Sequence, residues 1–295
     1  MSAAPVTPTR IAAGRTIVGY AMAESLRRKV FAVVVALTVA FLVLYALGAH
    51  FAFKELDARF YSPDELIDEK ALTGGTIFGL GMFAVLFLGA VLAVFLTNGV
   101  VRGDAESGLL QPLVVRPLGR GTMLIARYLG AVSVTTTYVV VIYVASVLIT
   151  KVTGDWTPSH MILAGAALAF ALAIIAAISL LLSVLMSATA QGIAVFMVFG
   201  AGLVGGVLGQ IGDALNSSSL QGISDVVTTA LPFEAIYLSA LNLITQDQTV
   251  TTQAIIKLGP FGGVRDGGPG LTVFAVIYVF AVLGGAVYAF GRRDL

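Results

Sequence analysis

The chain has 295 residues, of which 58% are apolar and only 11% are charged, and its formal net charge is +1. Soluble proteins average roughly 25% charged residues, so this composition excludes an ordinary soluble fold and indicates a membrane protein. The absence of cysteine excludes disulfides, thiolate metal ligands and thiol nucleophiles.

The first 29 residues are rich in charge and lack the compact apolar core of a cleavable signal peptide. We therefore expect residues 1–29 to be retained on the cytoplasmic side, ahead of the first membrane-spanning helix. Their charged residues are Arg10, Arg15, Glu24, Arg27, Arg28 and Lys29.

Five long segments without a full charge predict six transmembrane helices, because a spanning helix needs about 20 mainly apolar residues and one of the segments is long enough for two. The uncharged stretch between Trp156 and Gly212 is long enough for two crossings, and the small polar residues from Ser187 to Gln191 mark the turn between them. The fold class that follows is an all-α integral membrane protein. The expected spans are residues 30–50, 76–98, 128–150, 161–186, 191–211 and 271–290.

The segments between these spans differ in polarity. Residues 54–70 contain nine charged residues and Pro63, so they predict an acidic loop outside the membrane. Residues 102–127 carry six charges among apolar residues, which indicates an interfacial or partner-binding segment. Residues 151–160 form a short link, in which Trp156 suits the membrane interface.

Residues 213–270 are mixed in character. Their apolar stretch from Val226 to Ile244 is interrupted by Pro232 and Glu234. A re-entrant or surface-lying hairpin fits this pattern better than a clean span, because a helix break and a carboxylate are both costly in lipid.

The charges are divided unequally between the two faces. With six spans and both termini on one face, that face holds eleven basic and four acidic residues, and the other holds six basic and twelve acidic, which matches the totals of 17 and 16. Cytoplasmic loops are enriched in Lys and Arg. We therefore expect both termini and the 102–127 loop on the cytoplasmic side of a cell inner or plasma membrane.

The chain lacks the motifs of nucleotide and hydrolytic sites: G-x-x-x-x-G-K-[ST], H-E-x-x-H and G-x-S-x-G are all absent. No ionisable residue lies in the middle of a predicted span, which argues against proton or sodium coupling. His50 and His160 near the outer helix ends raise the alternative of a metal pair, but two ligands make an incomplete site and boundary histidines are the simpler explanation.

An intramembrane enzyme is the least favoured function class, because it needs polar catalytic groups at depth. The spans offer scattered hydroxyl groups instead, such as Ser133, Thr135, Tyr138 and Ser179. The glycines from Gly200 to Gly209 predict close helix packing through Gly202 and Gly206 or Gly205 and Gly209, rather than a ligand site.

The segment from Glu106 to Ala131 resembles the region after the second span in permeases of type-2 ABC exporters, the group that includes the permease of the nitrous-oxide-reductase maturation system. The family pattern runs E-x-G-T-L, two leucines, P-x-x-R and a basic residue before the third span. Leu109 replaces the usual Thr, and Pro112 interrupts the helix expected there. The residues in register are Glu106, Gly108, Leu110, Leu113, Pro117, Arg120 and Arg127.

The resemblance implies a coupling helix that docks on a separate ATPase, and an ordinary lipid-bound surface loop is the alternative. It also implies a cytoplasmic elbow helix within residues 1–29, and the ending G-R-R-D-L is similar to the family's common terminus. The ATPase-coupling residues would be Glu106, Gly108, Leu110, Leu113, Pro117 and Arg120.

Residues 221–245 are similar to the family's re-entrant helices between the fifth and sixth spans. The resemblance implies an outer gate at Pro232, Phe233 and Glu234, with Glu234 within reach of water. An inert surface helix is the alternative reading of this segment.

The family further implies a single permease domain over residues 1–295, which acts as a homodimer or heterodimer on two ATPase subunits. The permease itself would bind no cofactor, and ATP and Mg would lie on the partner ATPase. Membrane lipids and an extracytoplasmic accessory protein are further expected partners, and nucleic acid is not. Export of a hydrophobic or amphipathic substrate is the implied function, and transmission of force to an outer-side protein without transport is the alternative.

Overall fold

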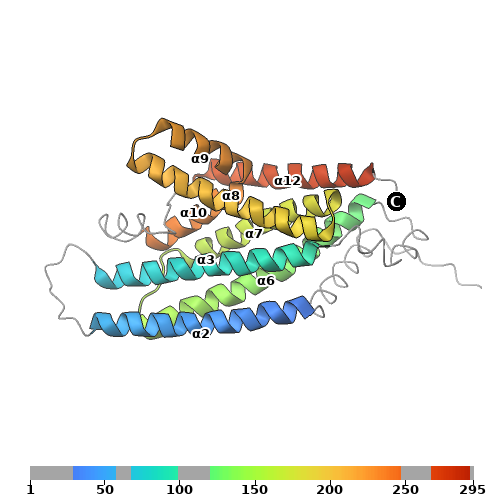
Figure 1. Ribbon diagram of the computed structural model, residues 1–295. Helices are drawn as coiled ribbons and strands as arrows, with labels where there is room; N and C mark the ends of the chain where they lie inside the picture. The colour runs from blue at the N-terminus through green and yellow to red at the C-terminus, as the bar shows by residue number, and fades with distance from the viewer. Residues whose placement is uncertain (1–28, 58–67, 99–119, 247–266, 293–295) are drawn as a thin grey trace, which may run out of the picture.

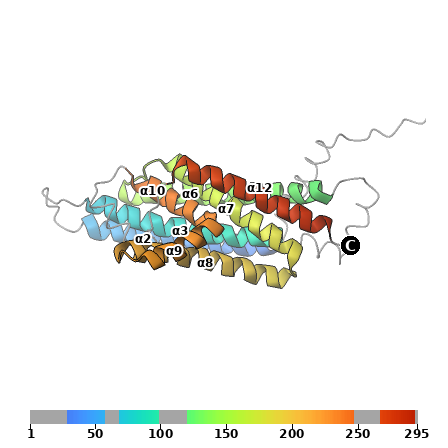
Figure 2. The ribbon, with the colours of Figure 1, turned by 90° about the horizontal axis from the view of Figure 1, so that it is seen from above.

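The computed structural model describes residues 29–57, 68–98, 120–246 and 267–292, and within these ranges the secondary structure is entirely helical (Figure 1). The helices form a bundle whose long members lie side by side, as two perpendicular views show (Figures 1 and 2). They are α2 (Lys29–Asp57), α3 (Glu69–Thr97), α6 (Arg120–Gly154), α7 (Met161–Leu185), α8 (Ala188–Ala214), α9 (Ser218–Ala230), α10 (Pro232–Thr245) and α12 (Pro269–Gly291).

Six of these helices are long and apolar enough to cross a membrane: α2, α3, α6, α7, α8 and α12. The prediction of an all-α protein with six membrane-spanning helices is therefore confirmed. Several helices extend beyond their apolar stretches; α3, for example, begins at Glu69 because the Asp68 carboxylate accepts a hydrogen bond from the Ala71 backbone N–H at 2.9 Å.

Helices α3 and α7 form the centre of the bundle. In their most apolar stretches 61% and 67% of the residues are buried, against 22% in α2 and 28% in α8 and α12. The outer helices instead present large apolar side chains on the surface, which lipid solvates without cost. Examples are Leu44, Val141, Val152, Met197 and Phe280.

Glycines bring the central helices close together, as membrane helix packing requires. A Cβ at Gly89 of α3 would lie 2.5 Å from Leu172 of α7. A Cβ at Gly74 would lie 2.5 Å from the indole ring of Trp156, which also packs at 6.0 Å between ring centroids on Phe78. Trp156 is therefore buried against α3, because Gly74 leaves room for its ring.

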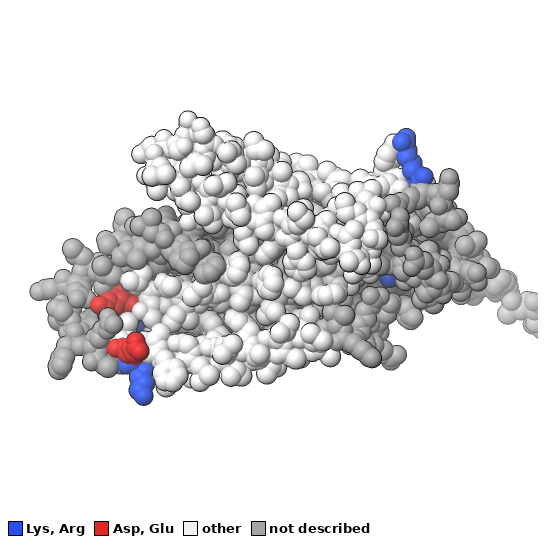
Figure 3. All heavy atoms as spheres, in the orientation of Figure 1, with Lys and Arg blue, Asp and Glu red and all other residues white. Residues whose placement is uncertain are grey.

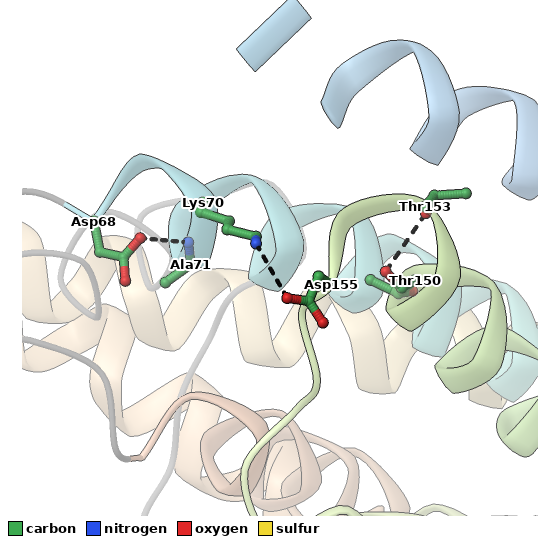
Figure 4. Close-up of polar contacts among 6 residues, drawn as sticks. All are labelled: Asp68, Lys70, Ala71, Thr150, Thr153 and Asp155. Carbon is green, nitrogen blue, oxygen red and sulfur yellow. Dashed lines mark hydrogen bonds and ion pairs between the residues drawn. The ribbon is translucent and has the colours of Figure 1, made fainter. Parts of the chain in front are cut away.

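Charged side chains gather at the ends of the bundle, while the long middle of the face in Figure 3 is uncharged. At one end Lys70 of α3 lies 3.9 Å from Asp155, which follows α6, and Asp68 caps α3 beside it (Figure 4). Both partners of this ion pair are exposed, so it contributes little to stability. Packing of the apolar helices must supply most of the stabilisation.

Replacing Gly74 with alanine should destabilise the bundle by about 1–3 kcal/mol, because the new Cβ would overpack the rigid indole of Trp156. The measurement is the thermal unfolding midpoint of the purified protein in detergent. Gly48→Ala is the control, because nothing lies within 4 Å of a Cβ at that position. Equal midpoints for the two variants would contradict the packing of Trp156 on α3.

Candidate functional site

Helices α9 and α10 form a sharply bent hairpin between the fifth and sixth spans. Their axes differ by 102° across the break at Leu231. Pro232 causes this break: it lacks the N–H that would continue α9, and its fixed φ suits the first turn of the next helix. The Tyr278 hydroxyl of α12 donates a 2.9 Å hydrogen bond to the Ala230 carbonyl, which ties the last turn of α9 to the bundle.

The hairpin packs on a row of glycines along α8, which we call the glycine face: Gly202, Gly205, Gly206 and Gly209. A Cβ at Gly202 would lie 2.5 Å from the Phe233 ring, and a Cβ at Gly209 would lie 2.6 Å from the Ser224 hydroxyl. Cβ atoms at Gly205 and Gly206 would overlap Val227 and the Glu234 carboxylate, respectively. The prediction of close packing through these four glycines is therefore confirmed.

These contacts place the tip of the hairpin at depth. Contacts run from Ser224 at Gly209 to Phe233 at Gly202, so α9 runs back along α8 from the C-terminal end of that helix. Gly206, which contacts Glu234, precedes the end of α8 at Ala214 by eight residues, or ~12 Å at 1.5 Å per residue. The bend between α9 and α10 therefore lies against α8 inside the bundle rather than at the end of that helix.

The three proposed gate residues, Pro232, Phe233 and Glu234, lie together at this tip and are all buried. The Phe233 ring stacks on Phe199 of α8, with ring centroids 5.7 Å apart and planes within 8°. Glu234 is only 2% exposed, so the expectation that water reaches it readily is wrong. Gly206 leaves room for the Glu234 carboxylate against the α8 backbone. The sequence around Glu234 could not predict this contact, because Gly206 belongs to another helix.

Two cavities flank α10. One, of about 260 Å³, lies between α3, α8 and α10 and is lined by Phe83, Leu203, Glu234, Tyr237 and Leu238 among others. The second, of about 630 Å³, lies between α7, α10 and the start of α12, and its lining includes Phe170, Ser239, Asn242, Gln246 and Thr272. Helix α10 therefore separates two spaces within the bundle.

The other end of the bundle holds a buried polar cluster that links three spans. The hydroxyls of Thr97 on α3 and Ser179 on α7 lie 2.7 Å apart, and the Gln191 Nε2 of α8 donates to the Ser179 hydroxyl at 3.0 Å and to its carbonyl at 3.1 Å. All three side chains are at most 1% exposed. In a low-dielectric interior such hydrogen bonds fix the relative position of the helices.

A family model described as ABC-2 family transporter protein matches residues 15–295. The chain belongs to this family. It is therefore a membrane permease component of an ABC transporter, it is not itself catalytic, and an ABC ATPase is its implied partner. No curated protein matches the chain. The match supports an ABC-2 type permease and does not single out the nitrous-oxide-reductase maturation group.

Most of the predicted coupling residues of this ABC-2 permease lie outside the described residues: Glu106, Gly108, Leu110, Leu113 and Pro117. Arg120 opens α6, at the same end of the bundle as the end of α3 (Figure 1). The polar cluster at Thr97 therefore lies next to the point where the chain leaves α3 toward the predicted coupling segment. The sequence did not predict this cluster. It assigned Gln191 to a polar turn, and Ser179 to a set of scattered hydroxyl groups.

The described part of the permease contains no group of three or more His, Cys, Asp or Glu side chains that could hold a metal ion. His50 lies on an exposed part of α2, where its ring contacts Phe51 edge-on, and His160 precedes the first turn of α7 with a φ of 43°. Ser179 is hydrogen-bonded to Thr97 and Gln191, an arrangement that positions helices and lacks the base that a nucleophilic serine requires.

Gly206→Ala should destabilise the permease by about 1–3 kcal/mol, because the added methyl group would displace the Glu234 carboxylate from the glycine face. Gly200→Ala on the same helix is the matched control, because a Cβ there meets nothing within 4 Å. Thermal unfolding in detergent compares the two variants with the unmodified protein. A normal midpoint for Gly206→Ala would show that the hairpin tip does not rest on α8.

Ser179→Ala should lower stability by about 1–2 kcal/mol, because it removes the hydroxyl that Thr97 and Gln191 share and leaves buried polar atoms with fewer partners. The control is Ser133→Ala, since the Ser133 hydroxyl donates only to the carbonyl of Leu129 on its own helix. Urea unfolding followed by helical circular dichroism measures the difference. The cluster would have no structural role if both variants unfolded alike.

Proposed function

We propose that this permease forms a substrate path for export together with a second permease copy or a similar subunit, and that two ATPase subunits drive it. The observation that carries the proposal is the bent hairpin whose tip packs on the glycine face, with a cavity on each side of α10. A helix pair of this kind can close the outer half of a path and still move, because a glycine surface presents no side chains that would interlock with it.

The outer gate in this proposal is formed by Pro232, Phe233 and Glu234. The gate opens when the hairpin slides along α8, which is a shear motion between packed helices. Phe233 then leaves Phe199, and the two cavities beside α10 join. Their largely aliphatic and aromatic lining suits a hydrophobic or amphipathic substrate.

The driving movement starts at the other end. Residues Glu106 to Arg120 dock on the ATPase, and ATP binding and hydrolysis on that partner shift the segment. Because α3 ends and α6 begins beside it, the shift is passed to both helices. The polar cluster of Thr97, Ser179 and Gln191 then carries it to α7 and to α8, the helix on which the gate rests.

Both termini of the permease lie in the cytoplasm in this arrangement, and the hairpin enters from the outer side of an inner or plasma membrane. The division of Lys and Arg between the faces supports this orientation. It also puts the coupling segment on the side where ATP is available.

Affinity purification from the native membrane should recover a soluble protein with a phosphate-binding P-loop. Glu106→Arg should reduce its recovery at least about tenfold, equivalent to 1.4 kcal/mol, by reversing a charge in the docking segment. Asp104→Arg makes the same charge change two residues away, outside the family pattern, and should leave recovery unchanged. Recovery of no ATPase with the unmodified permease would remove the main support for the coupling proposal.

The orientation can be tested by labelling single cysteines, because the natural chain contains none. Thr157 and Ser187 are both exposed and lie at opposite ends of α7. A membrane-impermeant maleimide should label Thr157→Cys in intact cells, and should label Ser187→Cys only after the membrane is opened. The reverse pattern would place the termini outside the cell.

A further inference from the structure

The larger cavity beside α10 has walls of different polarity. Twelve described residues line it, and Ser239, Asn242 and Gln246 belong to α10 and its C-terminal cap. Their spacing of three and four residues puts these three polar side chains on one face of the helix. The wall that α7 provides is apolar and consists of Leu163, Ala166, Ala167 and Phe170. A molecule in this cavity would therefore meet a polar surface on one side and an apolar surface on the other.

The start of α12 closes a third side of the cavity with little side-chain bulk. Gly267, Gly268 and Thr272 line it there. A Cβ at Gly267 would overlap the Ser239 hydroxyl, so this glycine leaves room for that hydroxyl between α10 and α12. Glycine also lets a ligand approach the backbone closely. Ser239 is only half-buried and Thr272 is exposed, so neither side chain is sealed from the cavity.

The polar groups of the lining are all uncharged. None of the twelve described lining residues is Asp, Glu, Lys, Arg or His. An ionic head group would lose its hydration here without gaining an opposite charge, which is costly. Hydroxyl and carboxamide groups can both donate and accept hydrogen bonds. The lining therefore favours a head group that is neutral and carries several hydroxyl groups.

The cavity is large enough and open enough to hold such a head group. Its volume of about 630 Å³ lies within the range of roughly 300–1,000 Å³ that is common for ligand sites. Leu163 and Ala166 line the cavity and are also exposed on the apolar surface of α7, Leu163 to 57%. An alkyl tail can therefore leave the cavity along α7 and remain in lipid.

We propose that this cavity binds the uncharged, polyhydroxylated head group of an amphiphile, as found in glycosyl lipids and alkyl glycosides. The head group exchanges hydrogen bonds with the α10 wall and Thr272, and the apolar face of its sugar ring lies against Phe170. The tail lies against Leu163 and Ala166. This inference rests on the proposed function, because it names the substrate class of the same path.

The test is equilibrium binding of radiolabelled dodecyl maltoside, below its micelle-forming concentration, to the full-length permease in nanodiscs of phosphatidylglycerol. Binding to empty discs is subtracted. The unmodified permease should bind the probe saturably. Dodecanol and dodecyltrimethylammonium, which have the same tail with no sugar and with a cationic head group, should not compete. Ser239→Ala and Thr272→Val should each weaken binding about threefold to tenfold, as expected for one hydrogen bond, and the double variant should weaken it further.

Matched variants separate loss of the site from general damage. Thr229→Val makes the same change as Thr272→Val at an exposed position of α9 outside the cavity, and should bind the probe normally. Ala166→Trp fills the cavity from an exposed position and should abolish binding. Ile162→Trp places the same ring on α7 at a residue that is 83% exposed and outside the lining, and should retain binding.

Normal binding by Ala166→Trp or by the double hydroxyl variant would overturn the proposal, as would equal competition by dodecanol. Replacing half of the phosphatidylglycerol with glucosyl diacylglycerol distinguishes two sources of the ligand. Competition by the sugar lipid identifies a membrane lipid as the occupant, and no competition identifies a free glycoside. The readout needs no ATPase, so failure of the permease to recover an ATPase and failure of this site are separate results.

Discussion

The close approach of α8 to the α9–α10 hairpin is the contact on which the structure around α10 depends. Lipid tails are as apolar as leucine, so membrane helices associate through close packing and hydrogen bonds rather than through a hydrophobic driving force. Four glycines on α8 provide that packing, and side chains of the hairpin fill the space they leave. The same contact sets the depth of Glu234 and shapes the cavities on either side of α10.

The two ends of the bundle are held by different forces. The half that contains the hairpin relies on packing against glycine, which presents a surface without side chains. The end with the last turn of α3 is held by directional hydrogen bonds among Thr97, Ser179 and Gln191, which keep three helices in a fixed relation. Because α8 takes part in both contacts, it connects the polar cluster to the hairpin, and the proposed gating uses this connection.

Apolar length alone predicted the six spans, and the glycine spacing in residues 200–209 predicted the packing face on α8. The partner of that face could not be read from the sequence, because Val227 and Glu234 meet α8 only through the bend at Pro232. The burial of Trp156 and the polar cluster were missed for the same reason: each depends on a residue from a distant helix, Gly74 in one case and Gln191 in the other. The coupling role of residues 106–120 stays a prediction.

The most direct test of the account is a reversible crosslink between the hairpin and α8. A Cβ at Gly209 would lie 3.3 Å from the Ser224 Cβ, near the 3.5–4.5 Å typical of disulfides, so Gly209→Cys with Ser224→Cys should crosslink on oxidation. In the reconstituted complex the crosslink should abolish substrate-stimulated ATP hydrolysis, and reduction should restore it. A crosslink that forms without changing this activity would show that the hairpin is a fixed part of the bundle, and failure to crosslink would contradict its position on α8.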